Sequence, residues 1–286
     1  MSLRDFKRWS VVTAASLCGV VARSTSQKRS TLPYIDVVSM HGTPVHVADR
    51  LKRLLEWLLR DRVPATMQDV RSAVQGNYAS SKPGLLVCLD DGRRDNFEVA
   101  APLLEKFGLR GVFFVPVDFV DCPESEQPRF VKQHNISYGT SEPDVHAMTW
   151  PQVRELHARG HSIGGHTSSH RRMPPGVPAT DLEYELVRSR RVLEDRLSAP
   201  VESFCWVGGE AHNYSVEAAA IVQQQYPMAF TSFYGPVRNH DNPHFLRRHN
   251  IEADWSLRRV DFYLSGIMER KYQSRSARTW ERVFAG

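Results

Sequence analysis

The sequence predicts an α/β protein in which parallel strands form a barrel of roughly seven or eight strand–helix units. Short apolar runs alternate with helical patterns from about residue 30 onward. Each strand–helix–strand unit returns the chain in the same direction, so the strands should be parallel. A length of 286 residues suits a closed barrel, and an open doubly wound sheet is the alternative architecture.

Seven apolar runs are predicted as strands. In chain order they cover residues 31–40, 84–89, 111–115, 161–165, 202–206, 228–233 and 244–251. The run GVFFV at 111–115 is apolar throughout, which is typical of a strand covered on both faces. Strands of this kind belong to a sheet that has helices packed against it.

Helices are predicted between these strands. Apolar residues recur at helical spacing over 47–59 and 97–107. Three further helices are expected to begin at the capping residues Thr149, Thr180 and Ser215. Each of the two threonines is followed three residues later by Gln or Glu, which predicts a capping box.

The N-terminal segment differs from the rest of the chain. Basic residues precede a short apolar stretch from Ser10 to Ala22, which is too short to span a bilayer. Helical spacing favours a helix lying on the body, and a secretion signal or membrane-surface anchor is the alternative. We therefore expect an N-terminal helix or extension over 1–30 and one barrel domain over 31–286. A cytoplasmic location is expected, with secretion or membrane association through this segment as the alternative.

Composition excludes several classes of protein. A hydrophobic content of 41% with 24% charged residues gives a packed core, which excludes disordered, collagen-like and coiled-coil chains. The net charge is +5, but the arginines form short groups broken by acids, which indicates solvated surface. No aromatic–basic stacking pattern accompanies them, so no nucleic-acid partner is expected. The four cysteines lack the paired spacing of a disulfide framework or zinc knuckle.

Polar residues follow three of the predicted strands, where a parallel sheet places its reactive groups. Asp90 and Asp91 follow one strand, His166 and His170 follow another, and the segment Val-Gly-Gly-Glu at 207–210 follows the third. Neighbouring carboxylates raise each other's pKa unless a positive charge is shared between them. Asp91 with the two histidines supplies one oxygen and two nitrogens, the ligand set of a catalytic zinc. Asp90 would then be the general base that takes a proton from water.

Histidine pairs also arise by chance, because the chain has 12 histidines and three His-x-x-x-His pairs. Random placement gives roughly 0.5 such pairs at any fixed spacing. The pair that begins at His157 straddles a predicted helix end, and the pair that begins at His240 lies in a predicted loop. We interpret both pairs as surface or packing residues. The pair His166 and His170 follows a strand and shares its expected edge with Asp90, which favours a metal site.

Two segments together resemble the polysaccharide deacetylase family, which shares the homology domain of the nodulation-factor chitooligosaccharide deacetylase. They are CLDDGRRDN at 88–96 and MTWPQVRELHARGHSIGGHTSSH at 148–170. The resemblance implies a distorted (β/α) barrel of about seven strands and metal-dependent hydrolysis of an N-acetyl group. It also implies that Asp90 is the base and that Asp91, His166 and His170 are metal ligands.

The chain departs from the family pattern in three places. The third motif reads CWVGGE, without the arginine that orients the base, although Trp206 matches an aromatic variant and the amide near Gly208 would still bind an oxyanion. The final motif is not recognisable, and His249 is the candidate general acid, with a strand-end histidine of no catalytic duty as the alternative. The Tyr-His-Arg sequence of exopolysaccharide-type relatives is absent, because 34–36 reads Tyr-Ile-Asp.

We therefore expect a metal-dependent hydrolase that removes N-acetyl groups from amino sugars of a poly- or oligosaccharide, with zinc as the expected divalent cofactor. One alternative is a hydrolase of cyclic amides or formyl amides. An alternative of another class is a non-catalytic protein that binds metal or glycan. The expected partner is an N-acetylated saccharide, with the aromatic residues Trp150, Trp206, Phe233 and Tyr234 as candidates for sugar contacts.

Overall fold

The structure is a computed structural model that describes residues 33–136, 145–208 and 211–284. The helix or extension expected over 1–30 lies outside the described residues. Within these described residues, nine strands form one sheet. They are β1 (Tyr34–Met40), β2 (Val63–Pro64), β3 (Gly84–Leu89), β4 (Val112–Val115), β5 (Ser162–Gly165), β6 (Ser203–Cys205), β7 (Met228–Phe230), β8 (Val237–Arg238) and β9 (His249–Asn250).

The main path of the sheet runs in the order β7-β6-β5-β4-β3-β1-β8. All neighbours on this path are parallel except β8, which is antiparallel to β1. Strand β9 lies parallel to β1, and an isolated bridge joins Leu246 to Phe230 of β7. The sheet therefore curls back towards its first strand, and the predicted distorted barrel is confirmed as a curled half-barrel.

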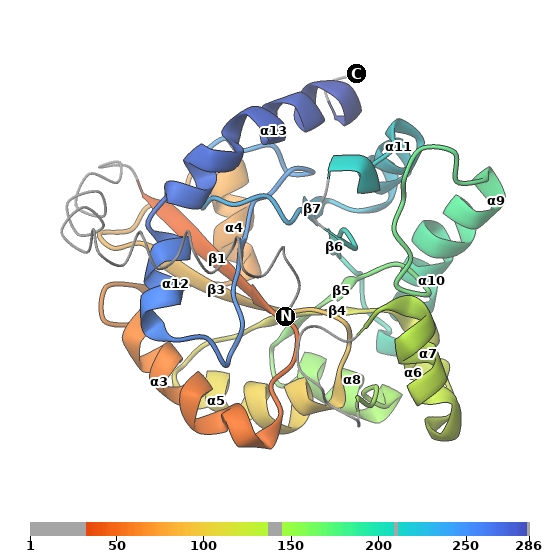
Figure 1. Ribbon diagram of the computed structural model, residues 1–286, viewed down its shortest axis with the longest axis horizontal. Helices are drawn as coiled ribbons and strands as arrows, with labels where there is room; N and C mark the ends of the chain where they lie inside the picture. The colour runs from red at the N-terminus through yellow and green to blue at the C-terminus, as the bar shows by residue number, and fades with distance from the viewer. Residues whose placement is uncertain (1–32, 137–144, 209–210, 285–286) are drawn as a thin grey trace, which may run out of the picture.

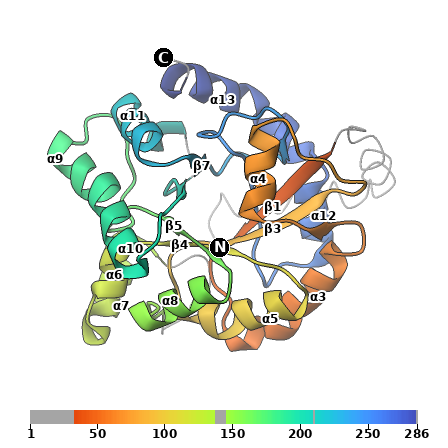
Figure 2. The ribbon, with the colours of Figure 1, turned by 180° about the vertical axis from the view of Figure 1, so that it is seen from behind.

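The α-helices surround the strands (Figures 1 and 2). They are α3 (Ala48–Leu58), α4 (Met67–Val74), α5 (Ala101–Lys106), α6 (Val117–Asp121), α7 (Gln127–His134), α8 (Trp150–Ala158), α9 (Ala179–Leu182), α10 (Ser189–Leu197), α11 (Val216–Gln225), α12 (Leu257–Leu264) and α13 (Ile267–Val283). Shorter pieces are the 3-10 turns η1 (Val45–Val47), η3 (Glu124–Glu126) and η5 (Ala211–Asn213) and the π-helical segments η2 (Asn96–Ala100) and η4 (Glu183–Arg188). In the described part of the chain no helix is both long enough and apolar enough to span a membrane.

Two of the three predicted helix starts are confirmed. The hydroxyl of Thr149 accepts a hydrogen bond from the amide of Gln152, and Ser215 caps α11 in the same way. The start expected at Thr180 is wrong, because α9 begins at Ala179 after Pro178 and has no side-chain cap. A proline fixes φ near the helical value, so it can precede a helix without the hydroxyl cap.

The central strands β1, β3 and β4 are buried on both faces, as the apolar run of β4 predicts. All seven residues of β1 and all six of β3 are buried. The strand predicted over 244–251 is shorter, with only His249 and Asn250 in regular pairing. The residues before it lie beside β7, where Leu246 bridges to Phe230 and its backbone bonds to Ala229 and Thr231.

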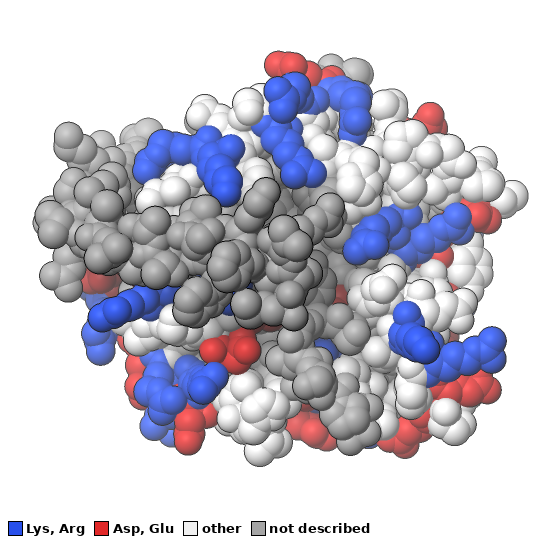
Figure 3. Space-filling model, in the orientation of Figure 1, with Lys and Arg blue, Asp and Glu red and all other residues white. Residues whose placement is uncertain are grey.

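The arginines described in the structure do not merge into one basic patch on the face that Figure 3 presents. Figure 3 shows separate patches of Lys and Arg divided by uncharged and acidic residues on the face that it presents. Many of these arginines have acidic partners: Arg188 pairs with Asp118, Arg190 with Glu194, and Arg247 with Glu269 and Asp241. Each of these acidic partners cancels the positive charge of its arginine locally.

Candidate active site

The ends of the parallel strands bring the predicted polar residues together. Asp90 and Asp91 directly follow β3, and His166 follows β5, with β4 between these two strands. The amide of Asp90 donates to the carbonyl of Met40 at the end of β1, at a distance of 2.9 Å. Asp91 has a φ of 73°, a left-handed conformation that is strained for a residue with a side chain.

Asp91, His166 and His170 form one cluster. The Nε2 atoms of His166 and His170 lie 3.4 and 3.1 Å from Oδ1 of Asp91. Ligands about 2.0–2.1 Å from a tetrahedral zinc are separated from each other by roughly 3.3 Å, so these distances fit one ion. The residues that the sequence predicted as metal ligands therefore lie together.

A hydrogen bond from Nδ1 to a backbone carbonyl orients each histidine ring. Nδ1 of His166 donates to the carbonyl of Cys205 at 2.8 Å, and Nδ1 of His170 donates to the carbonyl of His134 at 2.7 Å. A carbonyl oxygen only accepts, so the proton of each neutral ring lies on Nδ1. Nε2 is then left with its lone pair towards Asp91, as metal ligation requires.

The carboxylate of Asp91 is the strongest sign that an ion belongs here. Its side chain is 1% exposed, and neither oxygen has a hydrogen-bond partner among the described residues. Burial alone would raise the pKa of Asp91, but protonated forms of His170 and His166 would hold it well below its usual range, and a bound cation in place of those protons would act in the same direction, so the group stays charged. A buried charged carboxylate without hydrogen bonds is costly unless a cation shares the site.

A second group of side chains also has ligand atoms close enough for an ion. It consists of Asp90, His166 and Cys205. Burial raises the pKa of the Cys205 thiol well above its usual value, so this group is not a ready thiolate ligand. The carboxylate of Asp90 is also already engaged by an arginine, and the first cluster is therefore the better metal site.

Arg248 holds Asp90 through two hydrogen bonds. Its Nη1 donates to Oδ1 at 2.8 Å and its Nη2 donates to Oδ2 at 3.0 Å. Its Nε donates to the carbonyl of Thr231 at 3.1 Å, which fixes the plane of the guanidinium. Both side chains are almost fully buried, at 1% and 3% exposed. Burial opposes ionisation of Asp90, but Arg248 holds the pKa of this carboxyl below its usual range.

The third motif lacks the arginine that orients the base, as the sequence shows, but Arg248 from another segment of the chain contacts Asp90 instead. Arg248 lies 158 positions from Asp90 in the chain and directly precedes β9, which pairs with β1. The contact therefore depends on the segment that contains Leu246 and β9, which contacts both β7 and β1.

His41 stands at the same edge of the sheet, directly after β1. Its Nδ1 lies 2.7 Å from Oε1 of Glu252, and its amide donates to Oε2 of that carboxylate at 3.2 Å. Burial alone would lower the pKa of His41, but Glu252, with further contributions from Asp91 and Asp90, raises it to about 9. His41 is therefore protonated at neutral pH. His41 is not among the site residues predicted from the sequence, although it follows a predicted strand.

His249 lies elsewhere. Its Nε2 is 3.2 Å from Oδ1 of Asp36, and both side chains are fully buried. Asp36 is held in turn by Nε of Arg62 at 2.8 Å. Asp36 is near the beginning of β1, whereas the metal cluster is beside the end of that strand. The structure does not bring His249 to the cluster, and its neighbour Arg248 reaches Asp90 instead.

Comparison with known proteins agrees with this geometry. A family model described as polysaccharide deacetylase matches residues 77–227, which are more than half of the 286 residues. The chain belongs to the polysaccharide deacetylase family. The resemblance expected from the two sequence segments is therefore confirmed.

Individual deacetylase relatives are distant. The protein YxkH of Bacillus subtilis (strain 168), named as a polysaccharide deacetylase, is 22% identical over 187 residues, which are 65% of this chain. The chain spans 58% of that relative's length.

Solved structures share the deacetylase fold. Streptococcus pyogenes deacetylase PplD, in complex with acetate, has a TM-score of 0.61 and 17% identity, covering 78% of this chain and 94% of that chain. IcaB from Ammonifex degensii has a TM-score of 0.59 and 19% identity, covering 82% of this chain and 99% of that chain. A de-N-acetylase from Aggregatibacter actinomycetemcomitans has a TM-score of 0.61 and 17% identity, covering 80% and 99%.

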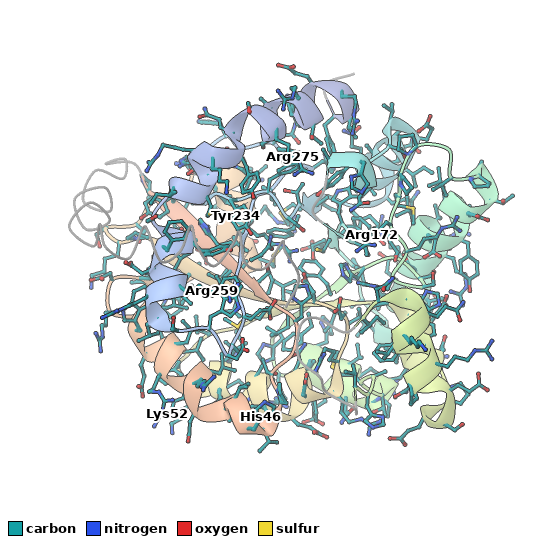
Figure 4. The ribbon with its side chains drawn as sticks, in the orientation of Figure 1. His46, Lys52, Arg172, Tyr234, Arg259 and Arg275 are labelled. Carbon is teal, nitrogen blue, oxygen red and sulfur yellow. The ribbon has the colours of Figure 1, made fainter. Side chains whose placement is uncertain are left out.

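In the segment that replaces the third deacetylase motif, Trp206 packs in the core and Gly208 has a left-handed backbone conformation. The Trp206 side chain is 1% exposed and packs on Phe204 and Tyr214, so it belongs to the core and not to a sugar-binding surface. Gly208 has a φ of 75°, and a Cβ there would lie 2.8 Å from Nε of Arg172. Arg172 lies inside the ring of helices in Figure 4, whereas His46 and Lys52 lie at its edge. Residues 209 and 210 lie outside the described part of the chain.

The remaining aromatic candidates also pack within the protein. Phe233 is 3% exposed, and Tyr234 stacks on Tyr272 with ring centroids 5.7 Å apart. The indole of Trp150 donates to Asp121 at 2.7 Å while Arg196 lies over its ring. None of these contacts places an aromatic face at the metal cluster.

Proposed function

We propose that this chain is a metal-dependent deacetylase that removes N-acetyl groups from amino sugars of a poly- or oligosaccharide. The observation that carries the proposal is the buried carboxylate of Asp91, which has no hydrogen-bond partner among the described residues and lies beside two histidines whose Nε2 atoms face it. Family membership supports the reaction class. One structural relative is described as a de-N-acetylase, and another was solved in complex with acetate, the acid product of such a reaction.

Asp91, His166 and His170 would hold the metal, and zinc suits this set of one oxygen and two nitrogens. When bound, a divalent ion at this site would polarise the acetyl carbonyl and lower the pKa of a water molecule. Three protein ligands leave room for water and substrate around the ion. We infer zinc from the donor atoms, in preference to ions that favour oxygen ligands alone.

Asp90 is the proposed general base. Its carboxylate is charged and is held rigidly by Arg248, so one oxygen can accept the proton of the attacking water. The two hydrogen bonds fix the carboxylate plane, and positioning of this kind lowers the entropic part of the barrier.

His41 is the proposed general acid, in place of His249. It is protonated at neutral pH because of Glu252, and Asp90 and Asp91 are close enough to raise its pKa further. Nδ1 faces Glu252, so Nε2 is the ring atom that would deliver a proton to the leaving amine. With Asp90 to accept the proton of the water and His41 to protonate the amine, hydrolysis of the amide gives acetate and a free amine.

Acetate release from a panel of N-acetylated oligosaccharides tests the proposal. The wild-type protein should release acetate, and Asp90→Asn should be slower by about 10²–10⁴-fold, the usual contribution of a general base. The variant should still bind zinc, because Asp91 and the histidines are unchanged. Equal rates for the two proteins would remove Asp90 from the mechanism. Zinc and glycan binding by the wild type without turnover of any acylated amine would favour the non-catalytic alternative.

A further inference from the structure

We infer that Glu185 is a positioning residue that fixes the loop from His166 to His170 and thereby sets the affinity and geometry of the metal site. The inference rests on the proposed metal-dependent function and concerns a residue that touches neither metal nor substrate. Glu185 is 3% exposed and lies in the π-helical segment η4. Its carboxylate contacts the backbone between the two histidine ligands.

Three hydrogen bonds reach this carboxylate from the loop. The amides of Ser168 and Ser169 both donate to Oε2 at 2.9 Å. The hydroxyl of Ser169 donates to Oε1 at 2.5 Å. Consecutive amides that converge on one oxygen form an anion-binding nest, and here the anion is a side chain of the protein itself. Hydrogen bonds to a charged acceptor are about twice as strong as those between neutral groups.

The loop needs such support because its backbone is strained. Thr167 and His170 have φ values of 62° and 60°, in the left-handed region. A residue with a side chain costs about 1–3 kcal/mol in such a conformation, and the surrounding structure has to hold it there. The two strained residues flank the two amides that Glu185 binds. Without Glu185 the loop would relax towards less strained conformations, and Nε2 of His170 would move relative to Nε2 of His166.

The neighbours of Glu185 complete the support. The hydroxyl of Ser168 donates to the carbonyl of Tyr184 at 2.7 Å. The amide of Asp118, in α6, donates to the carbonyl of Ser168 at 2.9 Å. The amide, carbonyl and hydroxyl of Ser168 are therefore all bound, from two different helical elements. Such complete satisfaction of a loop residue indicates that its conformation is specified.

The π-helical form of η4 fits this role. The run from α9 through η4 to α10 is one continuous helical stretch, and the wide turn spans Glu183–Arg188. Single wide turns of this kind occur frequently at functional sites. Glu185 is buried in this segment together with the apolar residues Leu186 and Val187.

Zinc affinity of the purified full chain tests the inference, measured in competition with a chromophoric chelator. Glu185→Ala should bind zinc about 10–100-fold more weakly than the wild type, the usual effect of losing an outer-shell partner. Glu185→Gln, which keeps an acceptor for the two amides, should lie between them. Glu183→Gln is the matched control, because this exposed neighbour has only a 3.7 Å contact with Arg191, and it should match the wild type.

The absorption spectrum of the cobalt-loaded protein should shift in both Glu185 variants, because it reports ligand geometry and not stability.

Wild-type affinity and cobalt spectrum in a folded Glu185→Ala protein would overturn the inference. If Glu185→Ala fails to fold by circular dichroism, a Glu185→Gln protein with wild-type affinity and spectrum would overturn it equally. A wild-type protein that binds no divalent ion at all would instead refute the proposed function. The two failures are therefore distinguishable in one set of titrations.

Discussion

Arg248 and Asp90 form a buried ion pair in which two guanidinium nitrogens meet the two carboxylate oxygens at 2.8 and 3.0 Å. The pair connects the segment before β9 to the end of β3, and so it ties the last segment of the barrel to the proposed catalytic base. It also sets the charge state of that base, because Arg248 lowers the pKa of a carboxyl that burial would otherwise raise. Stability and catalysis should therefore both depend on it.

Replacement of Arg248 tests this dependence. Arg248→Ala leaves Asp90 as an unpaired buried charge, and the free energy of unfolding should fall by about 3–5 kcal/mol. Arg248→Lys keeps the charge but loses the two-point contact, so acetate release should fall by about 10²-fold through misplacement of Asp90. Denaturant unfolding and acetate release measure the two effects. Arg247→Lys is the matched control: its partners Glu269 and Asp241 are partly exposed, so it should keep wild-type activity. Wild-type activity in Arg248→Lys would show that the two-point contact is dispensable.

The two candidate acids are distinguished by paired variants. His41→Gln should lower kcat by about 10²–10⁴-fold, because the leaving amine loses its proton donor. His249→Gln should keep kcat within a few fold and instead lower the melting temperature, because a fully buried ring beside Asp36 is disturbed. Steady-state kinetics and thermal unfolding on both variants give the answer. The reverse pattern would return the acid role to His249.

The pair His41–Glu252 predicts the alkaline limit of activity. Glu252 raises the pKa of His41 from 6.5 to about 9, so the acid should be lost as the pH rises through that value. Glu252→Gln removes the carboxylate, and the alkaline limb of the kcat/KM profile should move to lower pH. A limb that stays in place would mean that another group sets it.

The same pair makes a prediction for stability. A raised pKa means that the stabilisation is complete below the ordinary value of 6.5 and is lost as the pH rises through about 9. Glu252→Gln should therefore lower the melting temperature below pH 6.5 and have little effect well above pH 9. An equal loss at both ends would indicate a packing effect and not an ion pair.

Much of the fold could be predicted from the sequence because its signals are local. Apolar runs such as GVFFV and capping residues such as Thr149 act over a few positions, and they gave the strand–helix alternation and most helix starts correctly. The metal cluster was also predictable, because Asp91, His166 and His170 follow strands whose ends meet at one edge of a parallel sheet.

The parts that were missed depend on contacts between distant segments. Arg248 reaches Asp90 across 158 positions, and nothing in the local pattern of FLRRHNI says which of its two arginines points inward. His41 carried a usable signal, because it directly follows the first predicted strand, whereas the Tyr-His-Arg sequence of family members would place a histidine near the start of that strand. Glu185 lies between apolar residues of a helix, where a carboxylate has no apparent role until its partners at Ser168 and Ser169 are seen.

Anomalous diffraction at the zinc edge, from crystals of the protein grown with zinc, tests the central claim most directly. The account predicts one strong peak about 2.0–2.1 Å from Nε2 of His166, Nε2 of His170 and an oxygen of Asp91. A peak between Asp90, His166 and Cys205, or no peak near either group at saturating zinc, would contradict it.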